Sequence, residues 1–231
     1  MKISNIQIPL LFVVLMWIPF LVELAFDTKL SWLGIYPREF KSLGGIFLSP
    51  FIHGDVKHLM SNTIPMLVLG SLTYYFYRPV FYKAYFYSIF FTGLLVWLFA
   101  RPSFHIGASG VIYALASLLF FSGMFRKSYR LVAVSLIVVF LYGGMIWGVL
   151  PLEDGISWES HLFGGIVGGV LALKYRKWVF LEKRVYRWET DEDDIRKMES
   201  VYGERYWENP PVEEKKMTIR YFFKPNPEKK D

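Results

Sequence analysis

Six long apolar segments constrain the fold of this chain more than any other feature. A helix that crosses the hydrocarbon core of a bilayer needs about 20 mostly apolar residues, because no water is present there to bond to the backbone. The sequence therefore predicts an all-α, polytopic membrane protein with a bundle of six transmembrane helices. The segments are roughly residues 7–26, 57–77, 80–100, 108–125, 130–150 and 158–175.

Composition divides the chain into two parts. Residues 1–177 hold 14 Lys and Arg against 7 Asp and Glu, whereas residues 178–231 hold 12 against 13. The positive excess belongs to the apolar part, where basic residues at helix ends set the orientation in a membrane, and this argues against a nucleic-acid partner. The chain has no cysteine, which excludes disulfides and thiolate chemistry. The first segment lacks a small-residue cleavage site, so we expect a retained anchor.

The second part, 178–231, is expected to be a charged cytoplasmic tail that is partly disordered. It is too short and too polar for a robust core. Asp191 to Tyr202 could form a short helix, with Thr190 as the N-cap and acidic residues in the first turn. After Pro210 we expect extended or disordered chain. The tail is either simply solvated or a docking segment for the membrane face or a partner.

Six spans place both termini on one side of the membrane, and basic residues indicate which side. Most basic residues outside the loop 27–56 favour cytoplasmic termini, and the loop after the fifth segment carries no Lys or Arg. In this topology the second, fourth and sixth segments run from outside to inside. Their N-terminal ends therefore share the outer leaflet.

Polar side chains lie at these three ends. His53, His58 and Asn62 flank the start of the second segment, Ser109 opens the fourth, and His161 lies just inside the sixth. Polar and ionisable groups are expensive in hydrocarbon, so a cluster of them indicates a functional site. The site could be catalytic, metal-binding or structural.

Ser109 lies in the sequence Gly-Ala-Ser-Gly. This motif alone is weak, because small residues are common where membrane helices pack. Ser109 opens a helix, however, where free N–H groups and the positive dipole end stabilise an oxyanion. Such a serine needs a base within about 2.6–3.2 Å.

His161 is the candidate base, although a lone intramembrane histidine is more often a packing residue. Glycines after it form two overlapping GxxxG spacings, which let two helix backbones approach closely. They indicate either simple packing or an approach that brings His161 to Ser109. These glycines are Gly164, Gly165, Gly168 and Gly169.

His58 and Asn62 are four residues apart and so share one helix face. Both could donate hydrogen bonds to a developing oxyanion on a substrate carbonyl. Asn62 could instead bond to a neighbouring backbone group. Three histidines could also ligate zinc. The chain has no HExxH motif and no acidic ligand on these helices, so no metal and no cofactor are expected.

The combined spacing resembles the rhomboid family of intramembrane serine proteases, over residues from about 7 to 177. The motifs are His-x4-His-x3-Asn, GASG followed by Tyr113, and His-x2-Gly-x3-Gly. The resemblance implies that Ser109 is the nucleophile and His161 the general base of a catalytic dyad. It implies an oxyanion hole of His58, Asn62 and the Ser109 N–H, with supporting positions at His53, Gly107, Tyr113, Gly164 and Gly168.

The resemblance also implies partners and location. Substrates would be transmembrane segments of other membrane proteins, cleaved near the outer leaflet of a bacterial inner membrane. Many rhomboids carry a Trp-Arg pair in the first external loop, whereas this chain has Pro37-Arg38-Glu39-Phe40. Inactive relatives lose the serine or the histidine, and this chain retains both. The alternatives are an inactive rhomboid-like protein that binds transmembrane helices, and a transporter, for which no internal repeat is visible.

Three further expectations concern parts around the dyad. Tyr113, rather than an acidic residue, would orient the imidazole, because Glu159 points elsewhere on its helix. Substrate would enter by movement of the fifth segment, at Gly143-Gly144, and of the loop Pro151–Ser157. The loop 27–56 is rich in aromatic residues. It is either a segment that lies in the membrane interface or an ordinary ordered loop.

Overall fold

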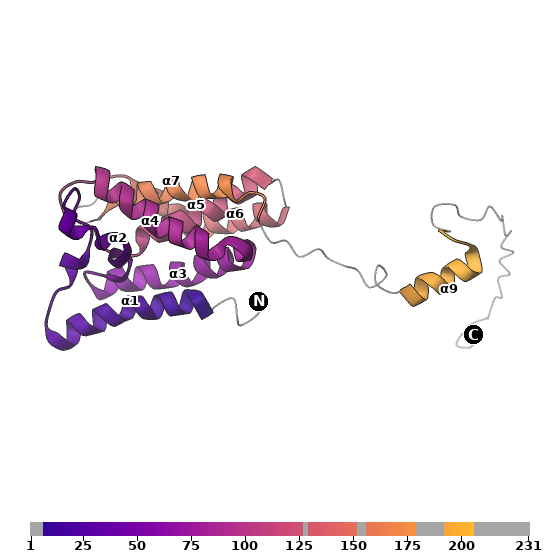
Figure 1. The fold of residues 1–231 in the computed structure, drawn as a ribbon, viewed down its shortest axis with the longest axis horizontal. Helices are drawn as coiled ribbons and strands as arrows, with labels where there is room; N and C mark the ends of the chain where they lie inside the picture. The colour runs from indigo at the N-terminus through magenta and orange to yellow at the C-terminus, as the bar shows by residue number, and fades with distance from the viewer. Residues whose placement is uncertain (1–6, 127–128, 152–155, 179–191, 206–231) are drawn as a thin grey trace, which may run out of the picture. The chain divides into compact units, whose positions relative to one another are not determined.

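The computed structural model describes residues 7–126, 129–151, 156–178 and 192–205. The chain divides into two compact units, Met1–Leu181 and Glu182–Asp231. Within the described residues all regular elements are helical, apart from one isolated β-bridge between Ile35 and His105. Figure 1 shows the long helices of the first unit side by side.

The helices of the first unit confirm the prediction of an all-α polytopic protein. Three stretches are long and apolar enough to cross a membrane: residues 7–26, 56–99 and 109–126. The second of these holds two helices joined by the short 3₁₀ element η5, Arg78–Val80. The long helices are α1 Gln7–Phe26, α3 Val56–Tyr77, α4 Phe81–Phe99, α5 Ser109–Arg126, α6 Tyr129–Tyr142 and α7 Trp158–Lys174.

The fifth segment differs from the expected single helix. The α-helix α6 ends at Tyr142, and the chain continues as the 3₁₀ helix η6, Gly143–Val149. Consecutive glycines at 143 and 144 explain the change, because each costs about 1 kcal/mol in an α-helix relative to alanine. The 14 residues of α6 reach only roughly 21 Å at 1.5 Å per residue, and η6 extends the segment.

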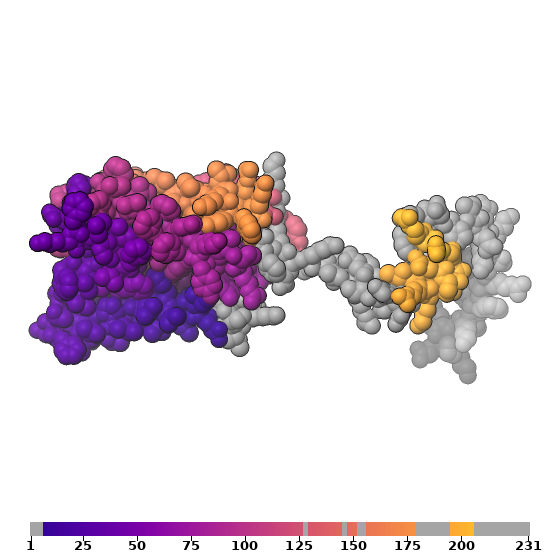
Figure 2. Space-filling view, viewed as in Figure 1, coloured from indigo at the N-terminus to yellow at the C-terminus, as the bar shows by residue number. Residues whose placement is uncertain are grey.

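Helix α5 is the centre of the first unit. It packs against α3, α4, α6 and α7. Its side chains Leu115, Leu118 and Leu119 are fully buried. Helix α1, by contrast, leaves Leu11 57% and Leu21 52% exposed. Figure 2 shows α1 along one edge of the bundle. An exposed apolar helix face of this kind fits contact with lipid.

Arg38 fixes the loop between α1 and α3 to the C-terminal end of α4. Its N–H donates to the Trp97 carbonyl at 2.9 Å, and its guanidinium donates to the Ala100 carbonyl at 2.9 Å. The Trp97 indole donates in return to the Glu39 carbonyl at 3.0 Å. A cation at a helix C-terminus also stabilises the helix dipole. The loop contains the short helices η2 Ser31–Leu33, η3 Phe40–Ser42, α2 Gly45–Leu48 and η4 Ser49–Phe51.

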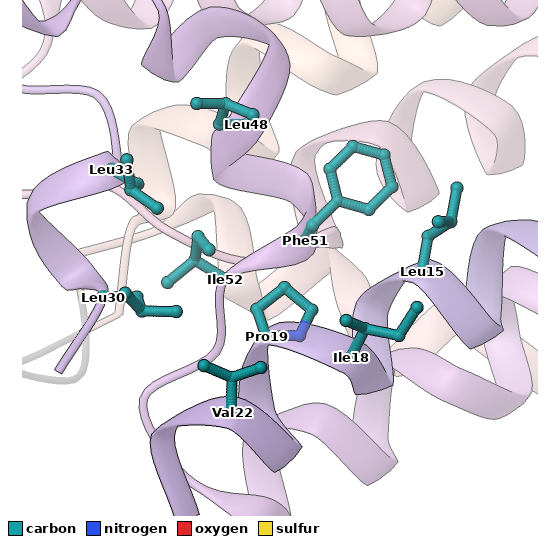
Figure 3. Close-up of a pocket in the computed structure, with 9 residues that line it drawn as sticks. All are labelled: Leu15, Ile18, Pro19, Val22, Leu30, Leu33, Leu48, Phe51 and Ile52. Atoms are coloured by element: carbon teal, nitrogen blue, oxygen red, sulfur yellow. The ribbon is translucent and has the colours of Figure 1, made fainter. Parts of the chain in front are cut away.

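A cavity of about 360 Å³ lies between α1 and this loop. Figure 3 shows that Ile18, Pro19 and Val22 of α1 face Phe51 and Ile52 of the loop. Every side chain that lines it is apolar, so it offers no group for acid–base chemistry. Leu15, Leu30, Leu33 and Leu48 complete its wall.

The second unit contains one described helix, α9, Glu192–Tyr202. The predicted tail helix, Asp191 to Tyr202, is therefore confirmed to within one residue. Its expected cap, Thr190, and the chain after Pro210 lie outside the described residues.

Glycines bring α5 and α7 into backbone contact. A Cβ atom added to Gly164 would collide with the Gly110 carbonyl, and one added to Gly168 would collide with the Ala114 carbonyl. A Cβ atom added to Gly165, the next residue, would meet no atom within 4 Å. Of the two overlapping GxxxG pairs, Gly164 and Gly168 therefore make the contacts with the α5 backbone, where no side chain fits.

Alanine substitutions separate the two faces of α7. Gly164→Ala and Gly168→Ala should each lower the free energy of unfolding by about 1–3 kcal/mol, because the new methyl group meets rigid backbone. Gly165→Ala is the matched control and should leave the stability unchanged or slightly higher. Thermal unfolding midpoints in detergent micelles measure the difference. Equal losses in all three variants would contradict the packing assignment.

Candidate active site

The side chains of Ser109 and His161 meet at the N-terminal ends of α5 and α7. The His161 Nε2 atom lies 2.7 Å from the Ser109 Oγ atom. Ser109 is the first residue of α5, so the N–H groups of the first helical turn have no partner within the helix. His161 is 8% exposed. Two residues that are 52 positions apart in the sequence thus share one hydrogen bond.

A backbone carbonyl orients the imidazole of His161. The Nδ1 atom lies 2.7 Å from the carbonyl oxygen of Gly148 in η6. A carbonyl oxygen can only accept, so Nδ1 carries the proton and Nε2 presents its lone pair to the Ser109 hydroxyl. This is the tautomer that a general base requires. The Gly148 carbonyl was not foreseen from the sequence.

Tyr113 supports the same ring from one side. The two ring centroids are 4.2 Å apart, and the ring planes differ by 3°. Glu159 does not contact the imidazole through any described bond. Its carboxylate is buried and pairs instead with Arg101, whose Nε atom lies 3.5 Å away. A stacked tyrosine ring and a backbone carbonyl thus contact the histidine on the side where an acidic residue orients it in soluble serine hydrolases.

Gly107 is required for two reasons where the chain enters α5. Its φ angle of 105° lies in the left-handed region that favours glycine. A Cβ atom there would also lie 2.7 Å from Nε2 of His58. The close approach brings the His58 ring against the segment that precedes Ser109. His58 itself stands in the first turn of α3, which Asp55 caps by accepting from the His58 N–H at 2.8 Å.

His53 holds the peptide directly before Ser109. Its Nδ1 atom lies 3.4 Å from the Phe51 carbonyl, so Nδ1 is the donor and Nε2 is free to accept. The Ala108 N–H donates to that Nε2 atom at 3.4 Å. Burial, and next the charge on neighbouring His58, lower the pKa of His53 from 6.5 to about 4. His53 is therefore a neutral acceptor at pH 7.

Asn62 and His58 line the same cavity as Ser109 and His161. The cavity has a volume of about 560 Å³. One N–H of the Asn62 amide donates to the His58 carbonyl at 2.9 Å, which is the backbone bond considered as the structural alternative. The amide nitrogen has a second N–H for a further acceptor. The cavity walls are Gly54, Asp55, Lys57, His58, Ser61, Asn62, Phe104, Ile106, Ser109, Ile156, Ser157 and His161.

In the part of the chain that the structure describes, no group of three or more His, Cys, Asp or Glu side chains is arranged to hold a metal ion. His53 and His58 have ring centroids 5.0 Å apart, and the Nε2 atom of His53 accepts from the Ala108 N–H.

His105 is a buried polar residue that was not predicted from the sequence. It is 2% exposed and lies four residues before Ser109. Its Nδ1 atom lies 2.5 Å from the Ser157 hydroxyl, at the start of α7. Burial lowers its pKa. The family spacing does not include this position, and only its place in a loop beside Ser109 could have drawn attention to it.

The lowered pKa of His53 predicts how stability depends on pH. Between pH 6.5 and about 4 the unfolded chain binds a proton at residue 53 that the folded chain does not, so stability is lost as the pH falls through this range. His105 contributes in the same direction. His53→Gln keeps an acceptor for the Ala108 N–H but cannot titrate. The unfolding midpoint of this variant should therefore fall less between pH 7 and pH 5 than that of the wild type. If the midpoint of the variant falls as steeply as that of the wild type, His53 does not cause the pH dependence of stability.

Comparison with known proteins identifies the family of this chain. The sequence model of the family described as Rhomboid domain matches residues 41–178. Uncharacterised proteins of Mycobacterium bovis and Mycobacterium tuberculosis are each 37% identical over 173 residues, covering 71% of this chain and 72% of the relative. One of Mycobacterium leprae is 34% identical over 173 residues, covering 71% and 68%. The chain is an integral membrane protein that belongs to the rhomboid family of intramembrane proteases.

Proposed function

We propose that this protein is an active serine endopeptidase that cleaves transmembrane segments near the outer leaflet with a Ser109–His161 dyad. The observation that carries the proposal is the hydrogen bond of 2.7 Å between Ser109 Oγ and His161 Nε2. The Gly148 carbonyl fixes the tautomer that makes this bond productive. A packing histidine would have no need of that tautomer beside a helix-opening serine.

Catalysis begins with proton transfer to His161. The Ser109 oxygen attacks the scissile carbonyl carbon as its proton passes to Nε2. The imidazolium that forms still donates from Nδ1 to the Gly148 carbonyl, and the Tyr113 ring covers one of its faces. His161 then gives the proton to the leaving amine, and the C–N bond breaks. A water molecule, deprotonated by the same nitrogen, hydrolyses the acyl-enzyme and restores Ser109.

The negative charge that develops on the substrate oxygen is stabilised at the N-terminal end of α5. The Ser109 N–H has no partner within the helix and can donate to this oxygen. His58 and the second N–H of Asn62 supply further donors from the cavity wall. Such donors are worth most in a site shielded from bulk water.

Substrate and water meet in the cavity beside the dyad. A space of about 560 Å³ is large enough for a short extended peptide segment together with water. A transmembrane helix hides its carbonyl groups in its own hydrogen bonds, so the substrate must unwind locally before Ser109 reaches one. Helix-weakening residues near the cleaved bond should therefore favour cleavage.

The same proposal includes orientation and division of the chain. The excess of Lys and Arg at one set of helix ends supports cytoplasmic termini in a bacterial inner membrane. The Ser109 end of α5 then lies in the outer leaflet. Residues 1–177 form the catalytic domain, and residues 178–231 form a cytoplasmic tail.

Removal of either dyad member should abolish cleavage. Purified protein in detergent is given a helical membrane substrate, and Ser109→Ala and His161→Ala should each reduce turnover by at least about 10³-fold. Ser88→Ala is the matched control, because that buried hydroxyl bonds to the Ala84 carbonyl of its own helix. Turnover that survives either dyad change would refute the mechanism. Inactive wild-type protein that still binds the substrate would favour the inactive, helix-binding alternative.

Asn62 can be tested against a neighbour that makes the same structural bond. The Ser61 hydroxyl and the Asn62 amide both donate to the His58 carbonyl. If Asn62 stabilises the oxyanion, Asn62→Ala should lower kcat about 10²-fold with little change in KM. Ser61→Ala should cost far less. Equal effects of the two changes would assign Asn62 to the backbone bond alone.

A further inference from the structure

His105 joins two segments that carry the dyad. Its Nε2 atom lies 3.0 Å from the Arg101 carbonyl and so is the donor, which leaves Nδ1 to accept from the Ser157 hydroxyl at 2.5 Å. Ser157 Oγ lies 2.6 Å from the hydroxyl of Ser160, the residue before His161. The ring is almost fully buried, so this bond is shielded from water.

The two partners of this bond precede the two residues of the dyad by the same number of residues. His105 precedes Ser109 by four residues, and Ser157 precedes His161 by four. The Ser157 carbonyl also accepts from the His161 N–H at 3.4 Å, so Ser157 and His161 belong to one turn. A displacement of Ser157 relative to His105 would therefore reach His161 through one turn of α7 and Ser109 through the short loop that precedes it.

The glycine contacts alone do not set that distance. Gly164 and Gly168 let α5 and α7 approach, but van der Waals contacts between the two helices are not directional. Hydrogen bonds are directional and fix one register. The backbone of His105 adds a second constraint, because it exchanges two hydrogen bonds with Ile35, at 2.8 and 3.0 Å.

Arg101 makes a second set of contacts beside the His105–Ser157 bond. The Arg101 guanidinium donates to the Ile156 carbonyl at 2.5 Å and pairs with Glu159 of α7 at 3.5 Å. The guanidinium is partly exposed, with the Arg101 side chain 41% accessible, so solvent weakens this pair. The buried His105–Ser157 bond is the better defined of the two.

We infer that His105 is a positioning residue of the proposed protease. It bonds to Ser157 and thereby holds the loop before Ser109 against the first turn of α7, so that the Ser109 hydroxyl and His161 Nε2 stay within hydrogen-bonding distance. The inference rests on the proposed function of the dyad. It assigns to His105 no contact with the substrate.

The test compares variants that lose or keep the acceptor. His105→Ala and Ser157→Ala should each lower kcat and the rate of Ser109 labelling by a phosphonate about 10- to 100-fold, because small displacements of reacting groups are costly. KM should change less than about twofold. His105→Asn places Oδ1 where Nδ1 stood, as an acceptor for Ser157, and should restore most of both rates. The double variant should be no slower than the slower single variant, since both remove one bond.

Val96→Ala is the control for lost stability. Val96 is buried in the cluster with Ile35 and Ala100. No described hydrogen bond joins it to the His105 ring. It should lower the unfolding midpoint while kcat is kept. If His105→Ala does not fold, His105→Asn and Ser157→Ala still decide the question.

The outcomes separate the two proposals. An active wild type with unchanged kcat in His105→Ala or Ser157→Ala overturns the positioning role alone. That role is also overturned if His105→Asn is as slow as His105→Ala, or if activity falls only in step with the midpoint, as in Val96→Ala. A wild-type chain that neither cleaves nor labels overturns the proposed function, and the positioning role with it.

Discussion

Backbone contact between α5 and α7 is the constraint on which the geometry of the candidate site depends. The carbonyl groups of Gly110 and Ala114 lie directly against Gly164 and Gly168, where any side chain would collide. Only this approach lets a short serine side chain reach an imidazole on the neighbouring helix. The Tyr113 ring, one turn below Ser109, stacks on His161 in the same interface. Packing and the proposed chemistry therefore use the same two helix faces.

A backbone carbonyl orients the histidine without placing an ionised group beside it. A buried carboxylate carries a large desolvation cost, and the carboxylate of Glu159 pairs with Arg101 rather than with His161. The change from α6 to η6 at Gly143 provides that carbonyl. Near the C-terminal end of a helix the last carbonyl groups lack partners within the helix, and Gly148 uses its oxygen to accept from His161.

The sequence predicted the membrane bundle well because hydropathy and helix length are local properties. The segments agree with the observed helices to within a few residues, except that the fifth changes to a 3₁₀ helix after Tyr142. Topology predicted only that Ser109 and His161 lie at the same depth, since alternate helices start on the same side, and their pairing was implied by the resemblance to the rhomboid family. Three features could not be predicted: the Gly148 carbonyl, the anchoring of the first loop by Arg38, and the His105–Ser157 bond. Backbone carbonyl groups have no signature in a sequence, and the partners of Arg38 and His105 lie about 50 to 60 residues away.

The most direct test of the dyad is the position of a phosphonate adduct in the native protein. A serine-reactive phosphonate is added to the wild-type chain in detergent, and the modified residue is located by peptide mass spectrometry. A Ser109–His161 dyad predicts an adduct on Ser109 that does not form when His161 is replaced by alanine, because the serine then has no base. An adduct that forms equally well without His161, or that lies on another serine while Ser109 stays free, would contradict the dyad.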